Sequence, residues 1–314
     1  MKKISWNAIE IEITRRCQLK CAHCACGDAQ DIDISRDTID ALLDNTAMFG
    51  EVLFTGGEPT LNIDGMSYFL EQIKRRRIPL MYLNVITNGY EMSDDFVEVI
   101  KEYHAYMSAQ GADYDDGEYF IRISVSQDRY HVENTKCLKW YQEKLKDIAK
   151  VSPKTTGNVP FKIGRAKALK EALYTNKPNV HKLAIMTKEH TPICECSSDH
   201  FLLYEDQIIV ICDVFITAKG GLLNIGFHEY DGYSDQDVIC KLRKGVDIYE
   251  KLIEFNKGVY GACKYLCQES DDKYDNAAKL LLGMQKYSQV TNMSLDDSFT
   301  ELMKAIAGGY WNEQ

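Results

Sequence analysis

The chain has 314 residues, of which 45% are hydrophobic and 27% are charged, and its formal net charge at pH 7 is −10. These values predict a globular protein with one large domain, or with one large and one smaller domain. The acidic balance argues against general nucleic-acid binding. The sequence has no uninterrupted run of 18 apolar residues, so we expect no membrane span. Eleven cysteines without an N-terminal secretory signal favour a cytoplasmic protein that binds metal over a disulfide framework.

A group of three cysteines follows the first predicted strand with the spacing C-x3-C-x2-C. The alternating apolar run 8–13 predicts that strand. The loop that comes next carries Cys17, Cys21 and Cys24. Thiolates suit iron–sulfur clusters and zinc, and three of them leave one iron of a cubane cluster open to another ligand. Buried core cysteines, or a zinc site completed by Cys26 or His23, are the alternative interpretations.

The first half of the chain alternates strand-like and helix-like segments, which predicts βα units around a parallel sheet. After the first strand, the pattern predicts further strands at 52–55, 79–86, 119–126 and 181–186, and a strand that leads into a helix at 159–166. It predicts helices at 35–50, 64–76, 93–107 and 133–151, the first with Ser35 as its N-cap and Gly50 as its end. We therefore expect an α/β fold: an open, partial (β/α)6 TIM-like barrel over 1–185, followed by a smaller α+β extension over 186–314.

Glycine and polar residues stand where the predicted strands end. Gly56 and Gly57 follow the second strand and let the backbone approach a ligand, and Glu58 would present a carboxylate there. Ser124 and Ser126 share one face of the fourth strand because strand side chains alternate with period two. The alternative for the Gly-Gly-Glu segment is a plain tight turn, and the alternative for the two serines is that they are small residues inside the barrel. Ligands of open α/β sheets bind at the carboxyl ends of the strands, so these positions predict a site beside the cysteine loop.

The residues that follow the fourth strand are expected to crowd the mouth of this site. They are Asp128, Arg129, Tyr130 and His131. His131 is interpreted either as an ordinary surface residue or as a contact to substrate.

The cysteine spacing, its place after the first strand and the aromatic-type His23 before the last cysteine resemble the radical S-adenosylmethionine (radical SAM) enzymes. The resemblance implies that Cys17, Cys21 and Cys24 hold a [4Fe–4S] cluster, with S-adenosylmethionine on the fourth iron. An electron from the cluster would generate a 5′-deoxyadenosyl radical that abstracts hydrogen from the substrate. The family also implies an electron donor of flavodoxin or ferredoxin type.

The same resemblance implies a set of residues that bind the cofactor. They are His23, Gly56, Gly57, Glu58, Asn88, Ser124, Ser126 and Arg165. For Arg165, a surface position at the start of a helix is an equal alternative.

The C-terminal region resembles the start of an auxiliary-cluster extension of the SPASM or twitch type. The cysteines concerned are Cys194, Cys196, Cys212, Cys263 and Cys267. They would hold a second [4Fe–4S] cluster, stay unligated or bind zinc. Gln207, in the hairpin expected at 201–212, departs from the glycine of the family. A helix with Ser234 as its N-cap is expected to carry Cys240 among core residues.

The resemblance therefore implies an enzyme that acts on a peptide or protein, as in the maturation of ribosomal peptides. A small-molecule substrate, such as the precursor of a modified base, is the first alternative. A non-catalytic metal-binding protein that binds a partner is the second alternative, and it predicts no affinity for S-adenosylmethionine.

Overall fold

A computed structural model describes residues 2–110, 119–131, 135–154, 164–172, 185–187, 208–210, 214–224 and 238–258. The helices and strands of these residues are, in chain order, β1 (Ile4–Thr14), α1 (Arg36–Asp44), β2 (Thr46–Gly56), the 3-10 helix η1 (Pro59–Leu61), α2 (Ile63–Arg76), β3 (Leu80–Thr87), α3 (Asp94–Ser108), β4 (Ile121–Ser126), α4 (Thr135–Leu145), β5 (Lys150–Lys154), the 3-10 helix η2 (Gly164–Ala168), β6 (Ile185–Thr187), β7 (Ile208–Val210), β8 (Val214–Ile216), β9 (Gly221–Asn224), β10 (Val238–Lys241) and α5 (Ile248–Gly258). No helix in these ranges combines the length and the apolar character needed to cross a membrane.

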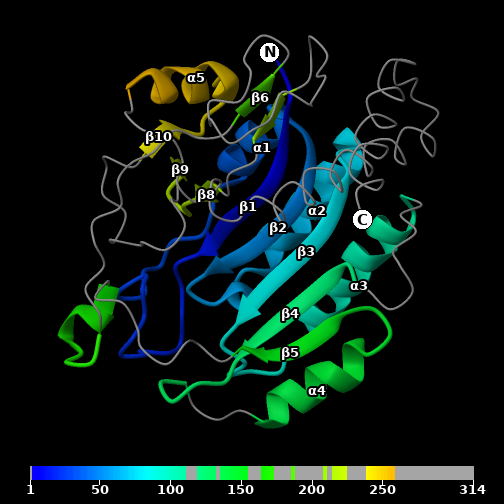
Figure 1. The fold of residues 1–314 in the computed structure, drawn as a ribbon. Coiled ribbons are helices and arrows are strands. Elements are labelled where there is room, and N and C mark those ends of the chain that lie inside the picture. The colour runs from blue at the N-terminus through cyan, green and yellow to red at the C-terminus, as the bar shows by residue number, and fades with distance from the viewer. Residues whose placement is uncertain are drawn as a thin grey trace, which may run out of the picture.

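One sheet organises the described part of the chain (Figure 1). Its strands follow the order β10-β9-β8-β1-β2-β3-β4-β5, and β7 pairs with both β1 and β6. Strands β1 to β5 are parallel to their neighbours, whereas β8, β9 and β10 pair antiparallel with one another on the other side of β1. The predicted α/β class, with an open and mostly parallel sheet, is confirmed.

An apolar row crosses the parallel strands and forms the core. Ile11, Phe54, Val85 and Ile123 are aligned on β1 to β4 and are fully buried. Helices α1 to α4 connect the strands and lie in a row, each packed on the next (Figure 1). Because strand side chains alternate, the neighbouring positions face the other way. That opposite face is polar, and on it the Asn84 amide donates a hydrogen bond to the Glu51 carboxylate.

The fifth and sixth strands differ from the prediction. Helix α4 ends at Leu145, where the backbone N–H groups of Ile148 and Ala149 fold back onto its carbonyl, and β5 then pairs with β4. The predicted helix over 133–151 is therefore too long, because β5 already begins at Lys150. Of the predicted strand that leads into a helix at 159–166, residues 159–163 lie outside the described residues, and Gly164–Ala166 begin the 3-10 helix η2. β6 pairs antiparallel with β7 near β1 instead of extending the sheet beyond β5. Pairing with a neighbour outweighs local propensity in such short segments.

Helix α1 ends earlier than Gly50, the predicted end. Ser35 is its N-cap, as predicted, but Asn45 caps its C-terminus through N–H contacts to the last carbonyls. Thr46–Gly50 already belong to β2. Their carbonyl and amide groups are taken up by pairing with β1 and by the chain at Pro79, which ends the helix.

The C-terminal segment differs from the prediction in one element, and two predictions for it stay untested. Val238–Lys241 form strand β10 rather than a helix, because they pair antiparallel with β9, and Cys240 is buried as predicted. The domain boundary at 185/186 stays a prediction, and described strands from both sides of it share the sheet. The hairpin expected at 201–212 lies largely outside the described residues; its Ile208–Val210 form β7.

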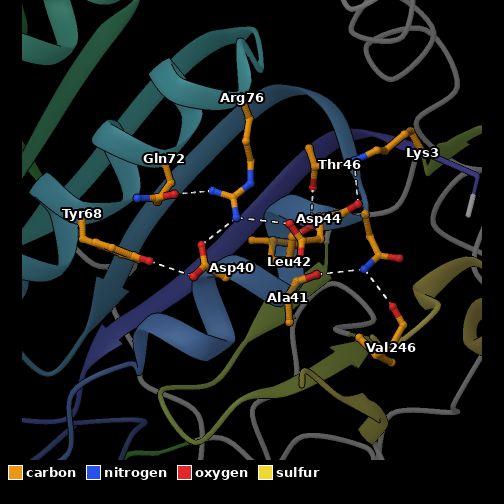
Figure 2. A network of polar contacts seen from close by, with 11 residues as sticks. Lys3, Asp40, Ala41, Leu42, Asp44, Thr46, Tyr68, Gln72, Arg76 and Val246 are labelled. Carbon is orange, nitrogen blue, oxygen red and sulfur yellow. Dashed lines mark hydrogen bonds and ion pairs between the residues drawn. The ribbon is translucent and has the colours of Figure 1, made fainter. Parts of the chain in front are cut away.

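A polar network joins α1 to α2 (Figure 2). The Arg76 guanidinium lies 2.7 Å from Asp40 and 3.2 Å from Asp44, and it also contacts Gln72. The Tyr68 hydroxyl donates to the same Asp40 carboxylate at 2.8 Å. These bonds hold α1 against α2, and they involve helix residues rather than the residues at the ends of the strands.

Candidate cofactor site

The cysteine loop leaves the end of β1 and is closed at its base. The backbone N–H of Arg15 donates to Ile32 O at 2.7 Å, and that of Gln30 donates to Arg15 O at 3.0 Å. Asp33 accepts from the Thr14 hydroxyl at 2.5 Å and from two nitrogens of the Arg16 guanidinium at 2.9 and 2.7 Å. A loop closed in this way keeps its three cysteines together near the sheet edge.

The three predicted cysteines share one electrostatic environment. Cys17, Cys21 and Cys24 are partly exposed and are free thiols. Burial, together with the charges of the Cys17 and Cys24 thiolates, raises the pKa of Cys21 to about 11. Burial likewise raises the pKa of Cys17. Each of these thiols therefore lies within the electrostatic range of the others, and their role as ligands of one cluster stays a prediction.

Cys26 modifies this group from within the same loop. A hydrogen bond from its thiol is the largest cause that lowers the pKa of Cys24, to about 6. The Cys26 Sγ also lies 3.7 Å from the carbonyl oxygen of Gly56. Cys26 therefore touches both the cysteine loop and the glycine turn.

The turn Gly56-Gly57-Glu58 is pressed against the start of the cysteine loop. The N–H of Gly57 donates to Thr14 O and the N–H of Glu58 donates to Arg16 O, both at 2.8 Å. A Cβ on Gly57 would lie 2.1 Å from that Arg16 oxygen, so only glycine fits. Gly56 has the same restriction and in addition a φ of +127°. The two glycines thus set the distance between β2 and the loop.

Glu58 is completely buried, and its carboxylate is engaged by protein donors. Oε1 accepts from the N–H and hydroxyl of Thr60 at 3.1 and 2.8 Å and from the Thr87 hydroxyl at 2.7 Å. Oε2 accepts from the N–H of Asn88 at 2.6 Å. Burial raises the pKa of Glu58, and these bonds oppose that rise. The geometry gives this carboxylate a positioning role for the turn after β3.

Asn88 connects the turn after β3 to the cysteine loop. Its amide nitrogen lies 3.7 Å from Cys17 Sγ and 3.5 Å from Gln18 Oε1. The predicted residues of β1, β2 and β3 are therefore joined in one constellation.

Arg165 also reaches the cysteine loop, from η2. Its N–H donates to Cys24 O at 2.9 Å and its Nε donates to Cys21 O at 3.0 Å, while its Nη1 lies 3.2 Å from Asp28. Gly164 has a φ of +51°, and a Cβ there would lie 2.3 Å from Cys24 O. The Gly164-Arg165 pair thus holds the loop at the carbonyl groups of Cys21 and Cys24.

The remaining predicted positions are found around the end of β4. Ser124 and Ser126 lie on one face of that strand, with Ser126 as its last residue. The His23 ring stacks on Tyr130 with centroids 4.5 Å apart, and burial lowers its pKa. The five cysteines predicted for an auxiliary cluster (Cys194, Cys196, Cys212, Cys263 and Cys267) lie outside the described residues.

Two residues with a part in this site were missed by the sequence analysis. Gln18 Nε2 and Gln127 Nε2 are buried and make no hydrogen bond, as is true of His23 Nδ1. Buried polar groups normally find partners, so such atoms around one sheet edge indicate a polar ligand. Each glutamine adjoins a predicted residue, Cys17 or Ser126, and that adjacency was the available signal.

Fold and site together define an α/β protein whose open sheet gathers three thiols, a glycine turn and polar side chains at the carboxyl ends of its strands. Residues 11–159 match the family model described as the Radical SAM superfamily. That part of the chain belongs to this superfamily, which is a family of enzymes.

Three known proteins can be compared with the chain. Fe-coproporphyrin III synthase of Methanosarcina barkeri (strain Fusaro / DSM 804) is 35% identical over 105 residues, which are 32% of this chain and 24% of that protein. The match thus spans about a quarter of the length of the relative. The structure of native anSMEcpe with bound AdoMet and Cp18Cys peptide has a TM-score of 0.46 and 12% identity, covering 98% of this chain and 99% of that one. The Streptococcus suis SuiB structure has a TM-score of 0.36 and 14% identity, covering 70% and 60%.

Proposed function

We propose that this protein is a radical SAM enzyme that binds a [4Fe–4S] cluster through Cys17, Cys21 and Cys24. The observation that carries the proposal is the meeting of these free thiols with the Gly56-Gly57-Glu58 turn and Asn88 at one sheet edge. When bound, such a cluster supplies the electron that cleaves S-adenosylmethionine and so starts hydrogen abstraction from a substrate.

The donor set fits this cluster. Thiolates are the ligands that iron–sulfur clusters take, and the three are accessible and on one closed loop. The N–H of Leu19 lies 3.4 Å from Cys17 Sγ and the Asn88 amide lies 3.7 Å from it, so two donors face a sulfur that would carry negative charge. The buried amide nitrogens of Gln18 and Gln127 suit the carboxylate and hydroxyl oxygens of S-adenosylmethionine.

The protein side chains then have separate tasks. Gly57 and Arg165 hold the cysteine loop in place through its carbonyls, and Glu58 orders the turn that bears Asn88. We assign the ribose and carboxylate groups of S-adenosylmethionine to the side of Ser124 and Ser126, and its adenosyl end to the side of His23. An exposed radical reacts with most C–H bonds, so orientation of the substrate and exclusion of water are the protein's share of the work.

A peptide or protein is the substrate we propose first, on the resemblance of the C-terminal cysteines to a SPASM or twitch extension, where a second [4Fe–4S] cluster would lie. A small molecule is the second candidate, favoured by the 35% identity to Fe-coproporphyrin III synthase. An electron donor of flavodoxin or ferredoxin type and a reducing cytoplasm belong to the same proposal, because the cysteines must stay reduced to bind iron.

The test is anaerobic purification, reconstitution with iron and sulfide, and detection of 5′-deoxyadenosine from S-adenosylmethionine. About four irons per chain are expected for one cubane and about eight for two. The variant with Cys17→Ala, Cys21→Ala and Cys24→Ala should lose both iron and cleavage, whereas Cys137→Ala, in the core, should keep them. Cleavage by the triple variant would reject the proposal. A fully loaded wild-type protein without affinity for S-adenosylmethionine would indicate a non-catalytic metal protein.

A further inference from the structure

A second group of metal-ligand side chains lies beside the cysteine loop. His23 comes from that loop, and Asp128 and His131 come from the turn after β4. The Asp128 carboxylate lies 2.9 Å from His131 Nδ1 and 3.7 Å from His23 Nε2, and one ligand atom from each residue lies within 4.8 Å of the others. The side chains of Asp128, His131 and His23 are only 7%, 11% and 14% exposed.

We propose that His23, Asp128 and His131 form a mononuclear site for a divalent transition-metal ion. It uses none of the three cysteines and borders the cofactor site through His23. Two imidazoles and one carboxylate are the donor set of many mononuclear Fe²⁺ sites, and the same donors suit Mn²⁺. Three protein ligands leave coordination positions open, which water or an oxygen donor of the substrate can take.

The distances are close to what one ion requires. Metal–nitrogen bonds of about 2.1 Å set the ligand atoms of a shared ion about 3 Å apart. Asp128 Oδ1 and His131 Nδ1 already have that separation. His23 Nε2 lies 3.7 Å from the other carboxylate oxygen, and no two of the three ligand atoms are more than 4.8 Å apart, so side-chain movements that total at most about 2 Å would bring them onto one ion. The His131 Nδ1 atom is buried and makes no hydrogen bond, although the carboxylate is 2.9 Å away, so that nitrogen is not committed to a protein acceptor.

The three side chains are held in place by their neighbours. His23 stacks on the Tyr130 ring and meets the His131 ring edge-on, with centroids 5.0 Å apart. Asp128 accepts the N–H of Tyr130 at 2.9 Å, and its carbonyl accepts the N–H of His131 at 3.0 Å. Tyr130 is itself fixed by Glu171 at 2.9 Å. Such support is what allows ligands to bind a metal without rearrangement of the backbone.

Mn²⁺ is a suitable probe because it prefers oxygen and nitrogen ligands over thiolates. We would titrate the anaerobically reconstituted protein with MnCl₂ and follow the electron paramagnetic resonance signal of free Mn²⁺. About one Mn²⁺ should bind per chain, and His131→Ala and Asp128→Asn should each weaken binding at least about tenfold. His104→Ala serves as the control, because that ring stacks on Phe120 of the α3–β4 region and should leave binding unchanged.

The proposal is overturned if the wild-type protein binds no Mn²⁺ at millimolar concentration, or if both His131→Ala and Asp128→Asn bind it as tightly as wild type. It does not rest on the radical SAM proposal. The triple cysteine variant, with the circular dichroism of the wild type, should still bind Mn²⁺, and loss of binding there would show that thiols hold the ion and would also overturn the proposal.

Discussion

The side-chain amide of Asn88 lies 3.7 Å from the Sγ of Cys17, although 71 positions separate the two residues in the chain. The contact exists because Glu58 holds the backbone N–H of Asn88 at 2.6 Å. A buried carboxylate that touches no sulfur thereby determines where an amide meets the cysteine loop.

Replacement of Glu58 by glutamine should destabilise the protein and weaken cofactor binding. Whichever way it turns, the side-chain NH₂ would face a backbone N–H that can only donate, that of Thr60 at the Oε1 position or that of Asn88 at the Oε2 position. We expect the free energy of unfolding to fall by about 1–3 kcal/mol, measured by urea denaturation, with weaker S-adenosylmethionine binding by calorimetry. Glu51→Gln is the control, since the half-buried Glu51 can still accept from Asn84 as an amide. Unchanged stability of Glu58→Gln would show that the carboxylate has no positioning role.

Gly57→Ala should lower the iron content of the reconstituted protein. The added Cβ would lie 2.1 Å from the carbonyl oxygen of Arg16, so the start of the cysteine loop has to move. Gly245→Ala is the matched control: its φ is +78°, but nothing lies within 4 Å of the added atom, so a backbone cost of about 1 kcal/mol is expected without loss of iron. Iron per chain and the thermal midpoint distinguish the two variants. Full iron in Gly57→Ala would contradict the close approach described here.

In the metal-free protein, the cysteine thiols should differ in their reactivity toward alkylating reagents. With a pKa of about 6, Cys24 is mostly thiolate at pH 7, whereas Cys21, with a pKa of about 11, is protonated. Thiolates are the reactive form, so in metal-free protein iodoacetamide should label Cys24 first, and labelling should slow as the pH falls below 6. Tandem mass spectrometry locates the label.

The variant Cys26→Ala identifies the cause of this difference. It removes the hydrogen bond that contributes most to the low pKa of Cys24, so the pKa should rise and labelling at pH 7 should slow. Cys137→Ala, in the core, should leave the rate unchanged. Equal labelling rates in wild type and Cys26→Ala would exclude this contribution.

Asn45→Ala should loosen the C-terminal described segment from α1. The buried Asn45 side chain donates to Ala41 O and to Val246 O at 3.0 Å and accepts from the N–H of Ile248, also at 3.0 Å. Loss of these bonds leaves buried backbone groups without partners and should cost about 1–3 kcal/mol. Hydrogen exchange should rise over 238–258. The exposed Lys3→Ala, which loses one bond to Asp44 O, should stay within about 0.5 kcal/mol of wild type. Unchanged exchange in Asn45→Ala would contradict this role.

Local patterns were sufficient for two helices in the first half of the chain. The helices over 64–76 and 93–107 agree with α2 and α3 to within a residue, because apolar periodicity and capping act over a few residues. The cysteine loop and the Gly-Gly-Glu turn could likewise be recognised from the sequence, because each is a short continuous segment whose residues are close together in any fold. The auxiliary-cluster cysteines and the nature of the substrate remain predictions.

The tertiary structure decided what depends on pairing across long separations. The segment at 150–154 is a strand because β4 offers it an edge, and 238–241 is a strand because β9 does. The hydrogen bonds of Arg165 to the cysteine loop, the burial of Glu58 and the grouping of His23 with Asp128 and His131 join residues far apart in sequence. These contacts form only where the pairing of strands brings distant parts of the chain together, so no pattern of neighbouring residues predicts them.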